Sequence, residues 1–462
     1  MRIHFWGTRG SIARPSPGTL RHGGNTACVE VIADDGTWVV LDCGTGAYEL
    51  SRDLRARGPL PPLGHLLIGH AHWDHIQGFP FFEPLYDARS EWSVYAAGDG
   101  SGHLKRILSE QMSPEHHPIA LGDLTASVHF RVLTEGTFRV GGIRVTAQYL
   151  HHSALTLGYR LEADGASLVY ATDHEPHVVP LHCGPPGSLP VHPEDRRHVA
   201  FLAGADLVVH DSQYTLAEYP SRRGWGHTPV ECAVDYAIAG AARRLALFHH
   251  DPDRDDTAVD ELVTLARTRA AATGAPLEIF AAAEGQDLEL RGRCAEESQR
   301  ASGTGSALLT PAVASARTIL LAQDDAALAL RLEAVLREDG LRLVKVTGLA
   351  EALDAARATP PSLLLLDLDV PRRELLAACR TLRSDGDPRL REMPVLLVAD
   401  SAPSERELQQ AFEAGVTDYL SRPIKPTLAR SRIRGWLMRS ATDDAARSAR
   451  SRKESDGVSE GT

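Results

Sequence analysis

The sequence has few cysteines, and none of them form a recognisable motif. Its six cysteines are scattered over 462 residues, and no two have C-x-x-C spacing. We therefore expect neither a disulfide framework nor a thiolate metal site. Reduced thiols in a cytoplasmic protein are expected instead. The first residues lack an apolar signal segment, and no hydrophobic run reaches membrane-spanning length. We therefore expect neither secretion nor a membrane partner.

The chain also lacks an excess of basic residues. Lysine and arginine number 49 against 61 aspartates and glutamates, a net charge of −12. This balance argues against a broad nucleic-acid footprint, although it leaves a local basic patch open. The hydrophobic content of 43% and charged content of 24% are typical of globular proteins. The length allows two or three domains, each with its own core.

Metal-binding side chains, by contrast, are concentrated in one short stretch. The sequence HAHWDH holds His70, His72, Asp74 and His75, and it follows the apolar run HLLIG. Such a run predicts a buried strand, and alternate residues of an extended chain share a side, so the first two histidines can point at one spot. Asp74 and His75 are expected where the chain turns into a helix. Imidazole and carboxylate groups are suitable ligands for zinc or a similar divalent metal. The alternative interpretation of this stretch is a polar loop without a metal.

Composition divides the chain into four segments. Residues 1–292 alternate apolar strand patterns with amphipathic helical patterns, which predicts an α/β layered fold with a site at one edge of its sheets. Residues 293–317 are small and polar, as in a flexible linker. Residues 318–440 repeat five strand–helix units, typical of a doubly wound parallel sheet. Residues 441–462 lack core residues and are predicted to be disordered.

Further candidate ligands follow later strand patterns. They are His151 and His152 in QYLHHSALTLGYR, Asp173 in VYATDHEP, and His249 and His250 in LALFHHDPD. Strand ends that carry such residues can meet at one edge of a sheet. The residues alone do not decide which histidine of each pair would bind a metal.

Taken together, residues 1–292 resemble the metallo-β-lactamase-fold hydrolases, in the branch of ribonuclease Z and the bacterial cyclic phosphodiesterases. The resemblance is carried by FWGTRGS, GGNT, LDCGTG, HAHWDH, GYR, ATD and LFHHDP. It implies an αββα sandwich for this part of the chain. It also selects His152 and His249 from the two pairs and leaves His151 and His250 as supporting or surface residues.

The resemblance further implies a centre of two divalent ions, taken as zinc, with manganese or iron as alternatives. One ion would be held by His70, His72 and His152, the other by Asp74, His75 and His249, and Asp173 would bridge them. Two ions about 3.5–4 Å apart can share a hydroxide and stabilise both oxygens of a displacement. Such a centre predicts hydrolysis more firmly than it predicts the bond that is cleaved.

A second pair of residues is expected to protonate the leaving group. Asp211 in LVVHDSQYT and His227 in RRGWGHTPVE match an acid–histidine pair that phosphodiester-cleaving members of the family carry. A carboxylate raises the pKa of a neighbouring imidazole, which suits it to general-acid catalysis. The alternative is a structural histidine. The predicted catalytic set is completed by Asp74, which would orient or deprotonate the attacking hydroxide.

Residues 318–440 resemble a response-regulator receiver domain with an incomplete acidic site. Asp367 in LLLLDLDVP matches the phosphoacceptor, and Asp324 matches one residue of the acidic pair. Gln323, Ala399 and Arg422 stand where the family has an acid, a hydroxyl and a lysine. Magnesium prefers clustered carboxylates, so Mg²⁺ binding and phosphorylation of Asp367 are not favoured. A docking or dimerisation module is expected instead, in a homodimer or with a signalling partner such as a histidine kinase.

The combined hypothesis is a cytoplasmic, dinuclear metal hydrolase with a receiver-like regulatory domain of a phosphorelay. A phosphodiesterase acting through a metal-bridging hydroxide is favoured. Residues 1–292 contain no long Gly/Pro-rich insertion for gripping tRNA, which favours a small or cyclic, nucleotide-like phosphodiester. The alternatives are a lactone, thioester or lactam hydrolase on the same metals, a signalling adaptor with a relic hydrolase domain, and a redox-active di-iron protein.

Overall fold

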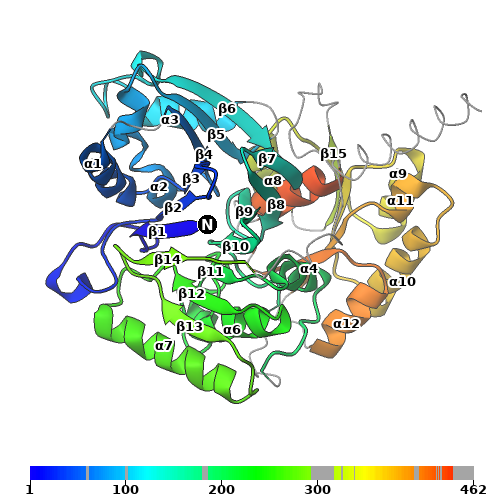
Figure 1. Cartoon of the computed structure of the whole chain (residues 1–462). Helices are drawn as coiled ribbons and strands as arrows, with labels where there is room; N and C mark the ends of the chain where they lie inside the picture. The colour runs from blue at the N-terminus through cyan, green and yellow to red at the C-terminus, as the bar shows by residue number, and fades with distance from the viewer. Residues whose placement is uncertain are drawn as a thin grey trace, which may run out of the picture. The chain divides into compact units, whose positions relative to one another are not determined.

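The chain divides into two compact units, one formed by Met1–Leu189 and Glu194–Pro311 and the other by Pro190–Pro193 and Ala312–Thr462 (Figure 1). The computed structural model describes residues 1–58, 62–98, 102–178, 186–292, 317–323, 326–337, 339–399, 405–422, 424, 426 and 429–440. The predicted linker lies outside these residues except for Arg317, and the predicted tail at 441–462 lies wholly outside them. The segment boundaries therefore stay predictions.

The first unit contains two seven-stranded sheets. The first sheet has the order β14 (Asp287–Glu289), β1 (Arg2–Gly7), β2 (Cys28–Ile32), β3 (Trp38–Leu41), β4 (Leu63–Leu67), β5 (Glu91–Ala97) and β6 (Ser127–Leu133). The second has the order β13 (Glu278–Ala281), β12 (Arg244–Phe248), β11 (Leu207–Asp211), β10 (Ala166–Ala171), β9 (Thr156–Ala163), β8 (Ile143–Leu150) and β7 (Gly136–Val140). Strands β3 to β6 and β10 to β13 are parallel, so their carboxyl ends share an edge.

The two sheets face each other, and helices cover their outer faces. Between the sheets, the Tyr159 hydroxyl donates to the Ile68 carbonyl at 2.7 Å and the Phe5 and Phe248 rings lie 6.1 Å apart. The helices of this unit are α1 (Gly46–Arg57), α2 (Trp73–Ile76), α3 (His103–Gln111), α4 (Pro193–Leu202), α5 (Tyr219–Arg222), α6 (Val230–Ala239) and α7 (Asp256–Ala271). This arrangement confirms the αββα sandwich that the resemblance implies.

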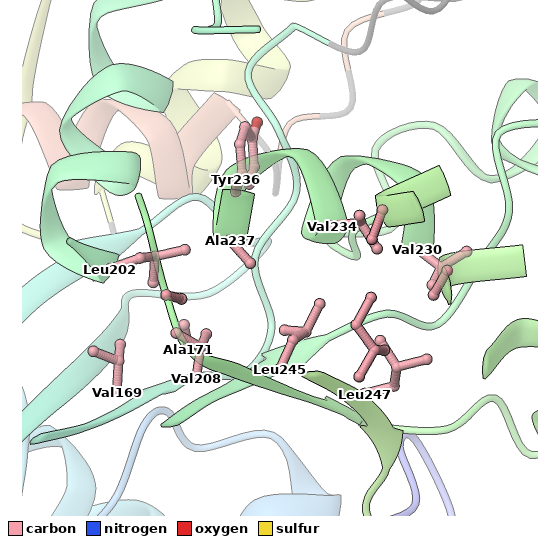
Figure 2. Packing of buried hydrophobic residues seen from close by; sticks show 14 of the residues in the cluster. Val169, Ala171, Leu202, Val208, Val230, Val234, Tyr236, Ala237, Leu245 and Leu247 are labelled. Carbon is pink, nitrogen blue, oxygen red and sulfur yellow. The ribbon is translucent and has the colours of Figure 1, made fainter. Parts of the chain in front are cut away.

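Buried hydrophobic residues fill the space between each sheet and its helices as well as the space between the two sheets. In Figure 2, Val230, Val234 and Ala237 of α6 pack toward Leu245 and Leu247 of β12. The three helix residues recur at intervals of four and three, so they form one apolar stripe. The neighbouring parallel strands are covered on both faces, which explains why they appear in the sequence as uninterrupted apolar runs. This packing holds the carboxyl ends of β10, β11 and β12 side by side.

The second unit is a five-stranded parallel sheet with helices between its strands. Its order is β16 (Arg342–Val346), β15 (Thr318–Gln323), β17 (Leu363–Asp367), β18 (Val395–Ala399) and β19 (Asp418–Ser421). Its helices include α8 (Ala326–Arg337), α9 (Leu349–Ala358), α10 (Arg372–Arg383), α11 (Pro388–Arg391) and α12 (Glu405–Glu413). The strand order 2-1-3-4-5 confirms the predicted doubly wound fold. In the part of the chain that the structure describes, every helix is too short or too polar to cross a bilayer.

Candidate metal centre

The seven predicted ligands come from four strand ends and converge on one place. His70 and His72 follow β4, and Asp74 and His75 belong to the short helix α2 that comes next. The remaining three, His152, Asp173 and His249, follow β8, β10 and β12. Their ligand atoms form two groups, His70, His72, His152 and Asp173 in one and Asp74, His75 and His249 in the other, with all atoms of a group within 4.8 Å of one another.

Asp173 lies between the two groups with one carboxylate oxygen toward each. Its Oδ2 is 3.5 Å from His70 Nε2 and 3.4 Å from His152 Nε2. Its Oδ1 is 3.2 Å from both His75 Nε2 and His249 Nε2. The geometry therefore allows one carboxylate to bind two cations at once.

The other contacts close each group. His72 Nδ1 lies 3.1 Å from His152 Nε2 in the first group. In the second, Asp74 Oδ2 lies 3.1 Å from His249 Nε2 and 3.3 Å from His75 Nε2. The membership of the two groups is the one that the resemblance implies.

The residues present fit divalent cations. His70 Nε2 and His75 Nε2 are buried and have no hydrogen-bond partner among the described residues, although each points at carboxylate oxygen. A buried imidazole nitrogen normally finds a partner, and a metal ion supplies one. Five imidazoles and two carboxylates are also the ligands that zinc and its first-row neighbours prefer.

Electrostatics show where positive charge is needed. Burial lowers the pKa of His70 well below its usual value and that of His152 to about 3, so both are neutral, as ligands must be. Burial would also lower the pKa of His75, but Asp74, Asp173 and Asp42 raise it well above its usual value. The second group thus attracts a proton in the place that a cation would occupy.

The two carboxylates of the centre stay ionised. Burial would raise the pKa of Asp74 and of Asp173, but the surrounding histidines outweigh it and hold both well below the usual value. Asp74 Oδ2 also accepts the backbone N–H of Ser11 at 2.7 Å, which fixes the carboxylate's orientation. Ionised and oriented carboxylates are suited to bind cations at neutral pH.

Asp42 supports the centre and is not among the residues predicted from the sequence. It is fully buried, and its Oδ2 accepts from His75 Nδ1 and from the Tyr170 hydroxyl, each at 2.7 Å. Its Oδ1 accepts the Gly69 N–H at 2.7 Å. By holding the Nδ1 proton, Asp42 leaves His75 Nε2 free for a metal. The only sequence signal was its place after the strand pattern WVVL in LDCGTG.

Two glycines let the backbone approach ligand histidines. Gly226 has a φ of +91°, and a Cβ there would collide with the His152 ring. Its carbonyl accepts from His152 Nδ1 at 2.9 Å, so the close approach also fixes the tautomer of that ligand. A Cβ at Gly10 would likewise collide with the His249 ring. Larger residues at either position would displace a ligand.

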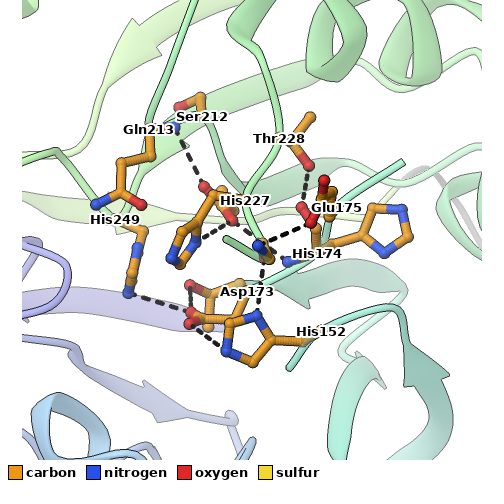
Figure 3. A network of polar contacts seen from close by, with 12 residues as sticks. His152, Asp173, His174, Glu175, Ser212, Gln213, His227, Thr228 and His249 are labelled. Atoms are coloured by element: carbon orange, nitrogen blue, oxygen red, sulfur yellow. Dashed lines mark hydrogen bonds and ion pairs between the residues drawn. The ribbon is translucent and has the colours of Figure 1, made fainter. Parts of the chain in front are cut away.

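His227 and Asp211 form a buried pair, and Figure 3 shows His227 beside His249 and Asp173 of the centre. His227 Nδ1 donates to Asp211 Oδ2 at 2.9 Å, and the His227 ring stacks on His249 with centroids 4.9 Å apart. Burial alone would lower the pKa of His227, but the Asp211 carboxylate raises it to about 9. The Asp211 carboxylate also accepts the N–H groups of Gln213 and His174, which fix its orientation.

The two rejected histidines lie outside the ligand groups, but they do not lie at the surface. His151 is 6% exposed and His250 is 1% exposed. His151 Nδ1 donates to the Glu175 carbonyl at 2.6 Å, and His250 Nε2 donates to the Ala282 carbonyl at 2.9 Å. Of the two expectations, supporting or surface residue, the first therefore holds for both, because each anchors backbone near a ligand.

In the second unit, the predicted phosphoacceptor is occupied by a side-chain partner. Asp367 ends β17 and is buried, and its Oδ1 pairs with the Arg422 guanidinium. Gln323 stands opposite Asp367 on β15, and Ala399 ends β18. Asp324 lies outside the described residues.

Fold and site together define an α/β sandwich with a histidine–aspartate centre, followed by a doubly wound domain. Residues 37–250 match the family described as the beta-lactamase superfamily domain, and residues 319–434 match the response regulator receiver domain. The chain therefore carries a beta-lactamase superfamily domain followed by a response regulator receiver domain. This confirms the two resemblances.

Three known proteins illustrate what the two parts of the chain are similar to. Ribonuclease Z of Haloarcula marismortui is 24% identical over 302 residues, covering 58% of this chain and 91% of that protein. The DNA-binding response regulator MtrA of Mycolicibacterium paratuberculosis is 32% identical over 127 residues, 28% of this chain, and the chain spans only 54% of that protein. The metallo-beta-lactamase fold protein YhfI of Bacillus subtilis is 15% identical with a TM-score of 0.43, covering 62% of this chain and 99% of that chain.

Proposed function

We propose that the first unit is a metal-dependent hydrolase that cleaves small or cyclic, nucleotide-like phosphodiesters in the cytoplasm. The observation that carries this proposal is the meeting of two ligand groups at Asp173, with the His227–Asp211 pair beside them. Similarity to ribonuclease Z over most of that protein's length supports the phosphodiester class. The charge of −12 supports a small substrate over a long nucleic acid.

The two ligand groups would each hold one divalent ion, and zinc is the ion we propose. When bound, such ions supply Lewis-acid charge and make water acidic enough to act as a nucleophile near neutral pH. The chain's own contribution begins with Asp74. Its ionised carboxylate, oriented by the Ser11 N–H, accepts a proton or a hydrogen bond from the attacking water.

His227 has the properties of the proton donor. Its Nδ1 is bound to Asp211, so the proton that can be transferred lies on Nε2, and the raised pKa keeps that proton in place at neutral pH. As the phosphorus–oxygen bond breaks, Nε2 donates to the leaving alkoxide and the ring becomes neutral. The Asp211 carboxylate keeps the ring oriented throughout.

For the second unit, we propose a docking or dimerisation role in signalling, with a histidine kinase or a second copy of the chain as partner. The Arg422–Asp367 ion pair supports this proposal, because the guanidinium already neutralises the carboxylate that would be phosphorylated. Phosphorylation would first have to break that pair.

The proposed activity is tested on the full chain after chelation and addition of Zn²⁺ or Mn²⁺. Substrates would be bis(p-nitrophenyl) phosphate, cyclic and linear dinucleotides, a structured RNA, a lactone and a thioester. We expect metal-dependent hydrolysis of the small phosphodiesters. Faster lactone or thioester cleavage would replace the proposal with another hydrolase, and faster RNA cleavage would overturn the small substrate. No hydrolysis by a metal-loaded sample would favour an adaptor.

Adjacent histidines offer a matched control for this experiment. His249→Ala removes a proposed ligand and should abolish the activity. His250→Gln alters the neighbouring buried histidine, which bonds the Ala282 carbonyl and belongs to neither ligand group. It should keep most of the activity if the sample remains folded by circular dichroism. Equal loss of activity in the two folded variants would contradict the assignment of His249, rather than His250, as a metal ligand.

A further inference from the structure

Glu175 is a buried carboxylate to which the mechanism above gives no role. It lies two residues after Asp173 and is 4% exposed. Its Oε1 accepts from the Tyr219 hydroxyl at 2.5 Å and from the Gly224 N–H at 2.7 Å, and its Oε2 accepts from the Gly226 N–H at 2.8 Å. All three donors are neutral, and two of them are backbone N–H groups of one short stretch, Gly224 to Gly226, so this buried carboxyl group binds that stretch directly.

The backbone of Glu175 is itself fixed. Its N–H donates to the His151 carbonyl at 2.7 Å, and its carbonyl accepts from His151 Nδ1 at 2.6 Å. The carboxylate therefore projects from a fixed point beside Asp173. This gives the buried His151 a supporting role without membership in a ligand group.

The stretch that Glu175 holds delivers two contacts to the centre. The Gly226 carbonyl accepts from His152 Nδ1, and His227 is the next residue along the chain. Gly224 and Gly226 have φ values of +76° and +91°, so this turn consists of residues with wide conformational freedom. Glu175 binds the N–H groups of both glycines and thereby removes that freedom.

We infer that Glu175 is a positioning residue for the leaving-group proton. It fixes the glycine turn so that His227 faces the ligand groups, and through Gly226 it orients His152. The inference rests on the proposed function, because it assigns His227 to proton donation. A turn free to shift by about 1 Å would misalign the donor, which can cost about 100-fold in rate.

The test uses Glu175→Gln with Tyr219→Phe as its matched control. Glutamine keeps the volume but presents an NH₂ group to N–H or O–H donors, so at least one bond to the turn is lost. Phenylalanine removes only the Tyr219 hydrogen bond and leaves both glycine bonds. Both variants are loaded with saturating Zn²⁺, and metal content and far-UV circular dichroism are recorded.

The readout is a comparison of two esters of one nucleotide, p-nitrophenyl and methyl. The p-nitrophenolate ion leaves without a proton, whereas methoxide needs one. We expect Glu175→Gln to lower kcat for the methyl ester by about 10- to 100-fold more than for the p-nitrophenyl ester, with KM little changed. Tyr219→Phe should lower kcat only slightly, and by the same factor for both esters.

Equal loss on both esters in a folded, metal-loaded Glu175→Gln sample would overturn the inference, and so would loss of metal without ester discrimination. If that variant does not fold, Glu175→Asp replaces it, because aspartate keeps the carboxyl group on a shorter side chain. It should lower kcat for the methyl ester more than for the p-nitrophenyl ester, by a smaller factor than Glu175→Gln. His227→Ala is run in parallel. If His227→Ala lowers kcat equally for both esters, the proposed function is overturned. If His227→Ala discriminates between the esters but Glu175→Gln does not, this inference alone is overturned.

Discussion

Each unit places an aspartate at the carboxyl end of a central parallel strand, but the two aspartates meet different partners. Asp173 follows β10 and faces four imidazoles, whose charge depends on protonation. Asp367 ends β17 and faces the guanidinium of Arg422, whose charge is permanent. A carboxylate of the first kind fits an added cation, whereas one of the second kind already has its counter-charge.

The surroundings of the two aspartates differ in the same direction. At the first site, Asp42 and the Gly226 carbonyl bind the Nδ1 atoms of His75 and His152, and the Nε2 atom of each ring faces Asp173. At the second, Gln323 and Ala399 are the matching positions that the structure describes, and neither carries a carboxylate for magnesium. The comparison supports the proposal that the metal ions bind to the first unit.

The largest effect is expected from Asp173→Asn. The change keeps the volume and tolerates the positive φ of +61°, but it removes the charge shared by both ligand groups. We expect a loss of about 1,000-fold or more in kcat/KM, since a metal ion contributes several kcal/mol and roughly 1.4 kcal/mol is a factor of ten. Kinetics and metal analysis of the folded variant check this. Near-normal activity with one ion lost would refute the bridging role.

The alkaline limb of the pH–rate profile should report His227. Its proton is present at low pH and is lost as the pH rises through the pKa of about 9, so methyl-ester hydrolysis should fall above that value. Asp211→Asn removes the charge that raises this pKa, and the limb should move to lower pH. At about pH 8 the loss should be roughly 10- to 100-fold. An unmoved limb would show that another group titrates.

A smaller effect is expected from Asp42→Asn, which weakens the support of His75. The amide can still accept from His75 Nδ1 or Tyr170, but it lacks the negative charge. We expect metal affinity to fall by about 10- to 100-fold, while activity at saturating metal is largely restored. Competition with a chromogenic chelator measures the affinity. Unchanged affinity would mean that Asp42 only stabilises the fold.

The smallest effect is expected from Asp367→Ala. Phosphodiester turnover should change less than about twofold, a coupling below roughly 0.4 kcal/mol. Incubation of the unaltered chain with acetyl phosphate should leave Asp367 unlabelled. The Arg422→Ala variant, which lacks the ion pair with Asp367, is incubated in parallel as the control. Stoichiometric, acid-stable labelling of Asp367 in the unaltered chain would restore the receiver to an active switch.

Parts of the fold and site were readable from the sequence because the signals are local. His70, His72, Asp74 and His75 lie within six residues, and parallel strands covered on both faces appear as apolar runs. Choosing His152 and His249 required the family resemblance. Strand β14 was not predicted, because three half-exposed or exposed residues give no periodic pattern.

The supporting residues could not be predicted for a different reason. Asp42 meets His75 across 33 positions of the chain, and Glu175 meets Gly224 across 49. One sequence gives no sign of such pairings, because each depends on how the two sheets and the loops are packed. Burial is likewise a tertiary property, and this explains why the sequence left open whether His151 and His250 are supporting or surface residues.

Metal stoichiometry tests the central comparison most directly. Elemental analysis of the full chain, dialysed after loading with zinc, should give two ions per chain, and Asp367→Ala should leave that number unchanged. His72→Ala should lower it. A folded, loaded sample that binds fewer than two ions, or that loses one when Asp367 is replaced, would contradict the account.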